Sequence, residues 1–202
     1  MHLADGVLNL PTLVGSAMGA TAGLIIGLRK LTPKTLPSAA LFAAVFFIVG
    51  TLHVPVGIGS VHLILNGLIG FLLGWLAFPV IFVALILQAL LFSFGGFAVL
   101  GANTFLLAAP AVIAHYALRS SIAGSLQSQR RLILLGAGAA VIGIGGASVI
   151  AMLMLWATGQ RDLLNLIALF GAAQIPVLII DAAVTALVVA ALGRALPSAF
   201  QQ

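Results

Sequence analysis

The sequence predicts an all-α integral membrane protein with seven transmembrane helices. Of its 202 residues, 63% are hydrophobic and only 5% are charged, whereas a soluble domain carries about 25% charged residues. The hydrophobic residues form long runs, without the alternating pattern of an outer-membrane β-barrel. We therefore treat residues 1–202 as a single membrane domain, with a short N-terminal segment over 1–10 and a helical bundle over 11–202.

Glycine, proline and charged residues divide the chain into its expected spans. The third span should begin at Val61 and contain His62, and Pro79 should break the chain before the fourth span. The seven expected spans are Pro11–Leu28, Leu36–Leu52, Val61–Ala77, a fourth that follows Pro79 and reaches Phe92, Phe105–Leu118, Leu132–Ala157 and Leu166–Leu192.

The first span carries a glycine at every fourth position: Gly15, Gly19, Gly23 and Gly27. In a bilayer such a row forms a groove that lets another helix approach closely. The spacing leaves two interpretations open, namely packing against other spans of the same chain and docking of a partner protein.

Two connections are unusual for a membrane protein. The stretch His53–Ser60 is interrupted by proline and glycine, and backbone of this kind must be buried in protein or line a cavity. The stretch Ser93–Thr104 is apolar yet rich in glycine, so we expect it to fold back into the bundle.

Basic residues predict the orientation. With seven spans and Met1 outside, the cytoplasmic side holds all but one of the 8 Lys and Arg residues. The inner residues are Arg29, Lys30, Lys34, Arg119, Arg130, Arg131 and Arg194, and the outer one is Arg161. No basic residue precedes the first span, as a cleaved signal peptide would require, so we expect Met1 to be retained. The C-terminus is then cytoplasmic, in a multi-pass protein of the cell (inner) membrane.

The pair Met1-His2 is a candidate metal chelator on the outer side. The α-amine, the amide nitrogen of His2 and its imidazole can close two small rings on a metal, and a fourth nitrogen completes a plane that suits Ni(II) or Cu(II). His62 is the best candidate for the fourth nitrogen. The alternative interpretations are a frayed terminus and a histidine that bonds to loop carbonyls.

Other polar residues on the outer side are candidates for supporting this site. His53 could be a fifth ligand, a group beside the ligands or a simple interface histidine. Asp5 could orient the His2 imidazole or cap the first helix. Asn66 and Asn103 could hold a ligand in place or satisfy backbone groups.

Two further polar residues lie within the spans. Asp181, in the middle of the last span, could mark an ion path or pair with a neighbouring helix. His115 lies near the inner end of the fifth span, and we expect it to be structural.

Several kinds of chemistry are excluded. The chain has no Cys, so thiolate metal sites and disulfides are impossible. No P-loop, HExxH pair or nucleophile motif is present, so we expect a capture subunit with no resident cofactor rather than an enzyme or a complete transporter. The few basic residues do not indicate nucleic-acid binding.

Three stretches of the sequence form a recognisable set: Met1-His2-Leu3-Ala4-Asp5-Gly6, Pro55–His62, and Gly95-Gly96 with Leu100–Asn103. Together they resemble the CbiM/NikM family, the substrate-binding S components of energy-coupling factor (ECF) transporters for cobalt and nickel. The resemblance covers the whole chain. The position of His53 is often not histidine in this family, and the Asn103 loop lacks a second Asn that some relatives carry.

This resemblance implies a seven-helix fold whose N-terminus inserts into the bundle. It also implies that Co(II) or Ni(II), the transported ion, is held by the Met1 amine, the His2 amide nitrogen and imidazole, and the His62 imidazole. The implied partners are a transmembrane coupling protein, cytoplasmic ATPase subunits and, commonly, a small accessory membrane subunit. The competing hypothesis is a structural or assembly subunit of the membrane whose histidines merely pack.

Overall fold

The computed structural model describes residues 3–51, 54–56, 59–122, 125–126, 128–159, 163–196 and 200, and the side chains of all of these except 54–56, 59–61 and 163–173. The described chain is mainly helical. Its helices are α1 (Leu10–Arg29), α2 (Leu36–Thr51), α3 (Asn66–Leu73), the 3₁₀ turn η1 (Gly74–Leu76), α4 (Ala77–Phe92), α5 (Leu100–Ile122), α6 (Gln129–Ala157) and α7 (Leu163–Ala195). A short antiparallel hairpin of β1 (Val54–Val56) and β2 (Gly59–Val61) follows α2, with Val54 opposite Val61.

The helices confirm the membrane-protein architecture. Five helical segments of the described chain are long and apolar enough to cross a bilayer, which takes about 20 residues. They are Leu10–Arg29, Asn66–Phe92, Leu100–Ile122, Gln129–Ala157 and Gln174–Ala195. The apolar helix α2, with 16 residues, is shorter.

The predicted third span, Val61–Ala77, is wrong as a continuous helix. It consists of the end of β2, four non-helical residues, the eight-residue helix α3 and the turn η1. Gly74 ends α3 because its φ of 56° and ψ of −124° lie outside the helical region. Pro79 does not break the chain, since it lies in the first turn of α4, where a missing N–H removes no helical bond.

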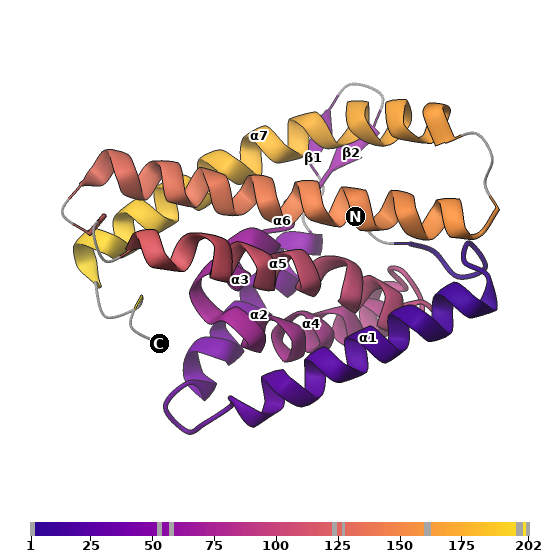
Figure 1. The fold of residues 1–202 in the computed structure, drawn as a ribbon, viewed down its shortest axis with the longest axis horizontal. Helices are drawn as coiled ribbons and strands as arrows, with labels where there is room; N and C mark the ends of the chain where they lie inside the picture. The colour runs from indigo at the N-terminus through magenta and orange to yellow at the C-terminus, as the bar shows by residue number, and fades with distance from the viewer. Residues whose placement is uncertain are drawn as a thin grey trace.

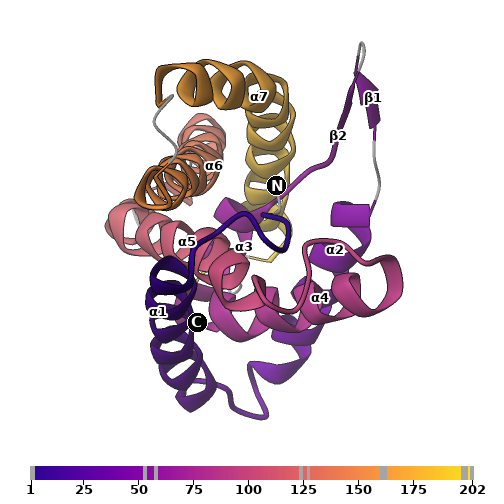
Figure 2. The ribbon, with the colours of Figure 1, turned by 90° about the vertical axis from the view of Figure 1, so that its right-hand side faces the viewer.

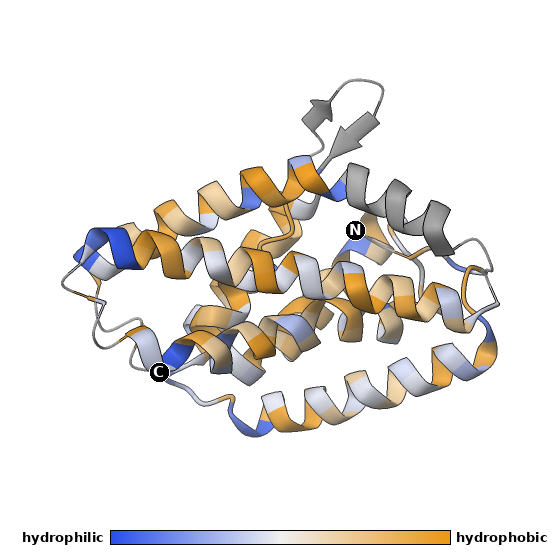
Figure 3. Cartoon of the chain, turned by 45° about the horizontal axis from the view of Figure 1, so that its top comes forward, coloured by the Kyte–Doolittle hydropathy of each residue, from blue (hydrophilic) through white to orange (hydrophobic). Residues whose placement is uncertain are grey.

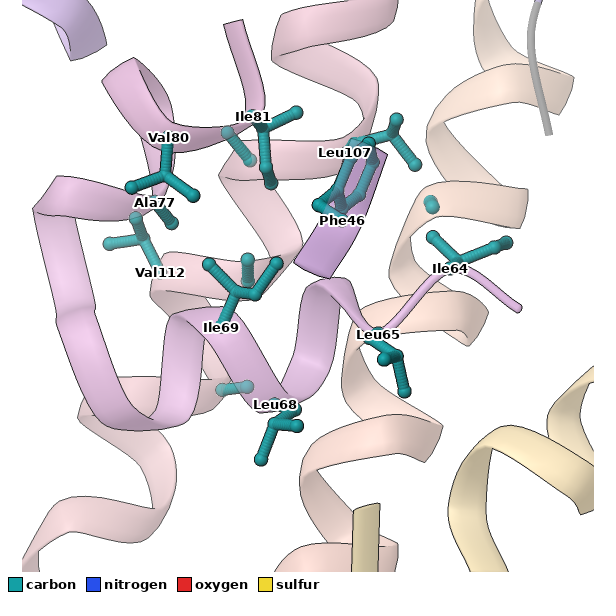
Figure 4. Packing of buried hydrophobic residues seen from close by; sticks show 14 of the residues in the cluster. Phe46, Ile64, Leu65, Leu68, Ile69, Ala77, Val80, Ile81, Leu107 and Val112 are labelled. Atoms are coloured by element: carbon teal, nitrogen blue, oxygen red, sulfur yellow. The ribbon is translucent and has the colours of Figure 1, made fainter. Parts of the chain in front are cut away.

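Helix α3 lies inside the bundle, and all eight of its residues are buried. It packs against α5 and α6, and Figure 4 shows its apolar side chains beside those of α2, α4 and α5. A side chain at Gly67 would collide with the backbone of Ala139 in α6, and one at Gly70 with the backbone of Ala111 in α5. The two glycines therefore allow a backbone approach that no other residue permits.

The glycine row of α1 faces the protein's own helices. A Cβ on any of its last three members (Gly19, Gly23 and Gly27) would collide with the same chain, whereas Gly15 has open space. The colliding groups are Phe105 of α5, Phe78 of α4, and Pro79 with the Trp75 carbonyl. The row as a whole is therefore not a docking face for a partner, because the contact that it permits is already made inside the chain.

The long helices run roughly along one axis (Figure 1). Many of the most hydrophilic residues lie near the helix ends (Figure 3). Basic residues lie at the end of α1, α5 and α7 and at the start of α6, which together form what we call the basic end. It contains Arg29, Lys30, Lys34, Arg119, Arg130, Arg131 and Arg194. The segment Leu3–Asn9 crosses the opposite end of the bundle, which faces the viewer in Figure 2.

Candidate functional site

One side chain of α5 binds both backbone polar groups of Leu3, in the segment that precedes α1. Asn103 of α5 accepts a hydrogen bond from the backbone N–H of Leu3 at 2.8 Å and donates one to the carbonyl of Leu3 at 3.0 Å. Leu3 and Asn103 are both buried, at 6% and 2% exposure. An amide that pairs with both polar groups of one residue mimics a β-ladder and fixes the direction of the backbone.

The same segment has a second attachment at the loop before α5. Asp5 accepts a hydrogen bond from the Val99 N–H at 3.3 Å through Oδ1. Its carboxylate lies against the Cα of Gly96, where a side chain would collide with it, and Gly96 has a φ of 127°. Glycine is required here for both reasons.

Two sequence-based expectations for this region need correction. Asp5 does not cap the first helix, because Asn9 does so: its Oδ1 accepts from the Thr12 N–H at 3.1 Å. The predicted loop Ser93–Thr104 is shorter, since α5 begins at Leu100 and carries Asn103 in its first turn. Apolar residues and a bond from the Asn103 N–H to the Val99 carbonyl allow the helix to start early.

The loop does contact the bundle, as expected, although not along its whole length. Val99 is fully buried, whereas Phe97 is 60% exposed.

His62 directly follows β2, four residues before α3, and is half-buried. Its Nδ1 is 3.1 Å from the carbonyl oxygen of Leu63. In the tautomer whose Nδ1–H donates to this carbonyl, the lone pair is on Nε2. A backbone carbonyl commonly orients a metal-binding histidine in this way.

Asn66 begins α3 and uses its side chain to join two other helices. Its Nδ2 donates to the carbonyls of Leu107 in α5 and Gly143 in α6, both at 3.0 Å, and its Oδ1 accepts from the Gly67 N–H at 2.9 Å. Because each polar atom has a backbone partner, the arrangement favours a structural role over metal ligation.

One turn of α5 binds both the N-terminal segment and the residues that follow His62. Asn103, which holds Leu3, and Leu107, whose carbonyl holds Asn66, are four residues apart on the same helix. Four residues correspond to about 6 Å along the axis and place both groups on one face. The N-terminal segment and the residues after His62 are therefore anchored to the same strip of α5.

Asp181 of α7 binds the backbone between His62 and α3. Its Oδ2 accepts hydrogen bonds from the backbone N–H groups of Ile64 and Leu65, at 2.9 and 2.8 Å. Of the two alternatives that the sequence left open, the structure supports pairing with a neighbouring segment. The partners were not predictable, because they are 117 and 116 residues away in the chain.

The remaining candidates are far from this network or outside the described chain. His115 bonds through Nδ1 to the Phe71 carbonyl at 3.0 Å, at the end of α3, which fits the expected structural role. Met1, His2 and His53 lie outside the described residues. Within the part of the chain that the structure describes, no three His, Cys, Asp or Glu side chains come together.

Comparison with known proteins identifies the family. The family model described as "Cobalt uptake substrate-specific transmembrane region" (CbiM) matches residues 2–199. The chain belongs to the CbiM family. This CbiM chain therefore belongs to a family of cobalt transport components, and its apolar helices are those of a multi-pass membrane protein.

Relatives agree with this assignment. The CbiM chain is 51% identical over 197 residues to a putative metal transport protein of Haemophilus influenzae, covering 98% of this chain and 95% of the relative. It is 32% identical to the fused nickel transport protein NikMN of Rhodobacter capsulatus, over 75% of this chain and 46% of that protein. It is 30% identical to the cobalt transport protein CbiM of Geobacter sulfurreducens, over 98% of this chain and 60% of that protein. The chain thus spans about half the length of these two longer relatives.

Solved structures show the same fold. A transition metal transporter has a TM-score of 0.73 and 26% identity to this CbiM chain, covering 96% of it and 93% of the transporter. A truncated transition metal transporter has a TM-score of 0.70 and 25% identity, covering 95% and 98% of the two chains.

Proposed function

We propose that this chain is the substrate-capture (S) subunit of an ATP-driven ECF importer for divalent cobalt or nickel ions. In this proposal the transported ion is held by the Met1 amine, the His2 amide nitrogen and imidazole, and the His62 imidazole. The observation that carries it is the double hydrogen bond between Asn103 and Leu3, which anchors the residue directly after His2 in the interior of the bundle.

Chain geometry supports a site near Leu3. Two residues span at most about 7 Å, so a site beside the Leu3–Asn103 pair is within reach of the backbone nitrogens of Met1 and His2. The strip of α5 that holds Leu3 also holds Asn66, four residues after His62. His62 is therefore four residues from a second anchor on the same strip.

The ligand set suits the two metals that the relatives' names mention. Nickel(II) accepts four nitrogens in a plane, and cobalt(II) accepts similar ligands with an added water or His53. A metal-bound amide nitrogen and amine must lose protons, so binding should release protons and strengthen as the pH rises.

The proposed topology has seven crossings, Met1 outside and the C-terminus in the cytoplasm of the cell (inner) membrane. It is supported by the basic end, since the basic residues at the ends of α1, α5 and α7 and the start of α6 share one side of the bundle. The proposed partners are a transmembrane coupling protein, cytoplasmic ATPase subunits that supply energy, and a small accessory membrane subunit.

The decisive experiment compares two N-termini. The purified protein with a native N-terminus, verified by intact mass, is titrated with Ni(II) and Co(II) beside a form extended by residues before Met1. We expect tight binding by the native form alone, and recovery of binding after a protease removes the extension completely. Equal binding by both forms would exclude the Met1 amine as a ligand and overturn the proposed site.

A matching transport assay tests the role in uptake. Cells that carry the partner subunits should accumulate the metal with the native chain but not with an N-terminally tagged chain. Normal uptake by the tagged chain, or by His2→Ala and His62→Ala variants, would instead support a structural or assembly subunit.

A further inference from the structure

We propose that Asp181 of α7 is a positioning residue for the transported metal ion, acting through the backbone that follows His62. This inference rests on the proposed function, since it assigns Asp181 the task of orienting the His62 ligand.

The contacts of Asp181 are specific and fully buried. Its Oδ2 accepts from the N–H groups of Ile64 and Leu65, at 2.9 and 2.8 Å, and its Oδ1 accepts from the hydroxyl of Thr185 at 3.2 Å. Asp181 and Thr185 both have 0% exposure. Burial strengthens these bonds, because water does not compete for the carboxylate.

The segment that Asp181 holds needs an external partner. The first N–H groups at the start of a helix have no partner within it, and Leu65, which precedes α3, provides no side-chain cap. Leu65 also has a left-handed backbone, with φ 52° and ψ 14°, which residues with a side chain rarely adopt. The surrounding structure must therefore impose this conformation, and the two bonds to Asp181 do so.

The turn at Leu65 sets the direction of the backbone between His62 and the start of α3. Asn66 is fixed by α5 and α6 through its amide, and Ile64 and Leu65 are fixed by α7 through Asp181. Three helices therefore fix three consecutive residues, Ile64 to Asn66, and the first of these is two positions after His62. Release of the bonds to Asp181 would let the backbone at Leu65 relax and move the imidazole.

The test uses Ni(II) titration of the native-terminus protein carrying Asp181→Ala or Asp181→Asn. Loss of a group that orients a ligand typically weakens metal binding by about 10–100-fold, and we expect this for Asp181→Ala, with an altered Ni(II) absorption spectrum. The asparagine variant should bind within a few-fold of the wild type, because its amide oxygen can accept both N–H bonds. Thr185→Val is the matched control, since it removes only the hydroxyl bond to the carboxylate.

The double variant with His62→Ala separates positioning from general stability. If Asp181 acts through His62, Asp181→Ala should cause no further loss of affinity in the His62→Ala background. A full additional loss, or wild-type binding and spectrum in Asp181→Ala, would overturn the inference. If His62→Ala itself binds as the wild type does, the proposed function fails first, irrespective of Asp181.

A second variant keeps the inference testable if the alanine protein does not fold. Asp181→Ser retains a polar group beside Thr185, but its hydroxyl is one bond shorter than the carboxylate. Folding is checked by gel filtration and thermal unfolding in detergent before each titration. Loss of affinity by a folded serine variant, with rescue by asparagine, supports the inference, whereas wild-type affinity of the serine variant contradicts it.

Discussion

Asn103 bonds to both backbone polar groups of Leu3, although the two residues are 100 positions apart. This pairing draws the N-terminal segment into the interior of a membrane bundle. It also places the segment one turn of α5 away from the carbonyl that holds Asn66.

We expect Asn103→Ala to detach this segment. The substitution leaves the buried N–H and C=O of Leu3 without partners, at about 1–3 kcal/mol for each group, so the segment should leave its site. Metal affinity in the native-terminus protein should fall by about 10–100-fold. Thr104→Val is the control, because its hydroxyl bonds to the Leu100 carbonyl within the same helix. Equal affinities of the two variants would contradict the role of Asn103.

Substitution of Gly96 should act at the second attachment of the segment. In Gly96→Ala the new methyl group would collide with the carboxylate of Asp5, so Asp5 must leave Val99 and metal binding should weaken. Gly159→Ala is the control for a positive φ, since Gly159 has a φ of 88° but no atom within 4 Å of an added Cβ. Both variants should lose about 1–3 kcal/mol of stability from positive φ, but only Gly96→Ala should lose affinity in a Ni(II) titration.

Two glycines of α6 should respond in opposite ways to alanine. A Cβ at Gly143 would collide with the backbone of Gly67 in α3, whereas Gly145 has open space around it. Gly143→Ala should therefore destabilise the protein by about 1–3 kcal/mol through overpacking. Gly145→Ala should be neutral or stabilising, because alanine favours helix by up to about 1 kcal/mol. Thermal unfolding in detergent measures both, and similar losses would disprove the close packing of α3 on α6.

The proposed orientation can be tested with single cysteines, because the natural chain has no Cys to give a background signal. Lys34→Cys lies at the basic end, and Phe97→Cys replaces a side chain that is 60% exposed in the loop before α5. A membrane-impermeant thiol reagent should label Phe97→Cys in intact cells and Lys34→Cys only in inverted vesicles. Labelling of both from one side would exclude the proposed topology.

Local patterns in the sequence were sufficient for most of the helices. The predicted spans Pro11–Leu28 and Leu132–Ala157 agree with α1 and α6 to within a few residues, because long apolar runs must form helices in a bilayer. The prediction failed at Val61–Ala77, where hydropathy continues through a break that only the backbone of Gly74 reveals. Hydropathy reports burial from water, and it does not distinguish a membrane-length helix from a short helix buried in protein.

By itself, the sequence determined the membrane class, most helix positions, the basic residues that share one end, and the family. The tertiary structure alone decided which groups meet across the bundle: Leu3 with Asn103, Leu65 with Asp181, and the glycines of α1 with the chain's own aromatic and proline side chains. The physical reason is the distance along the chain over which each interaction acts. Helix formation and insertion depend on neighbouring residues, whereas a buried polar side chain finds its partner wherever packing leaves a backbone group unsatisfied.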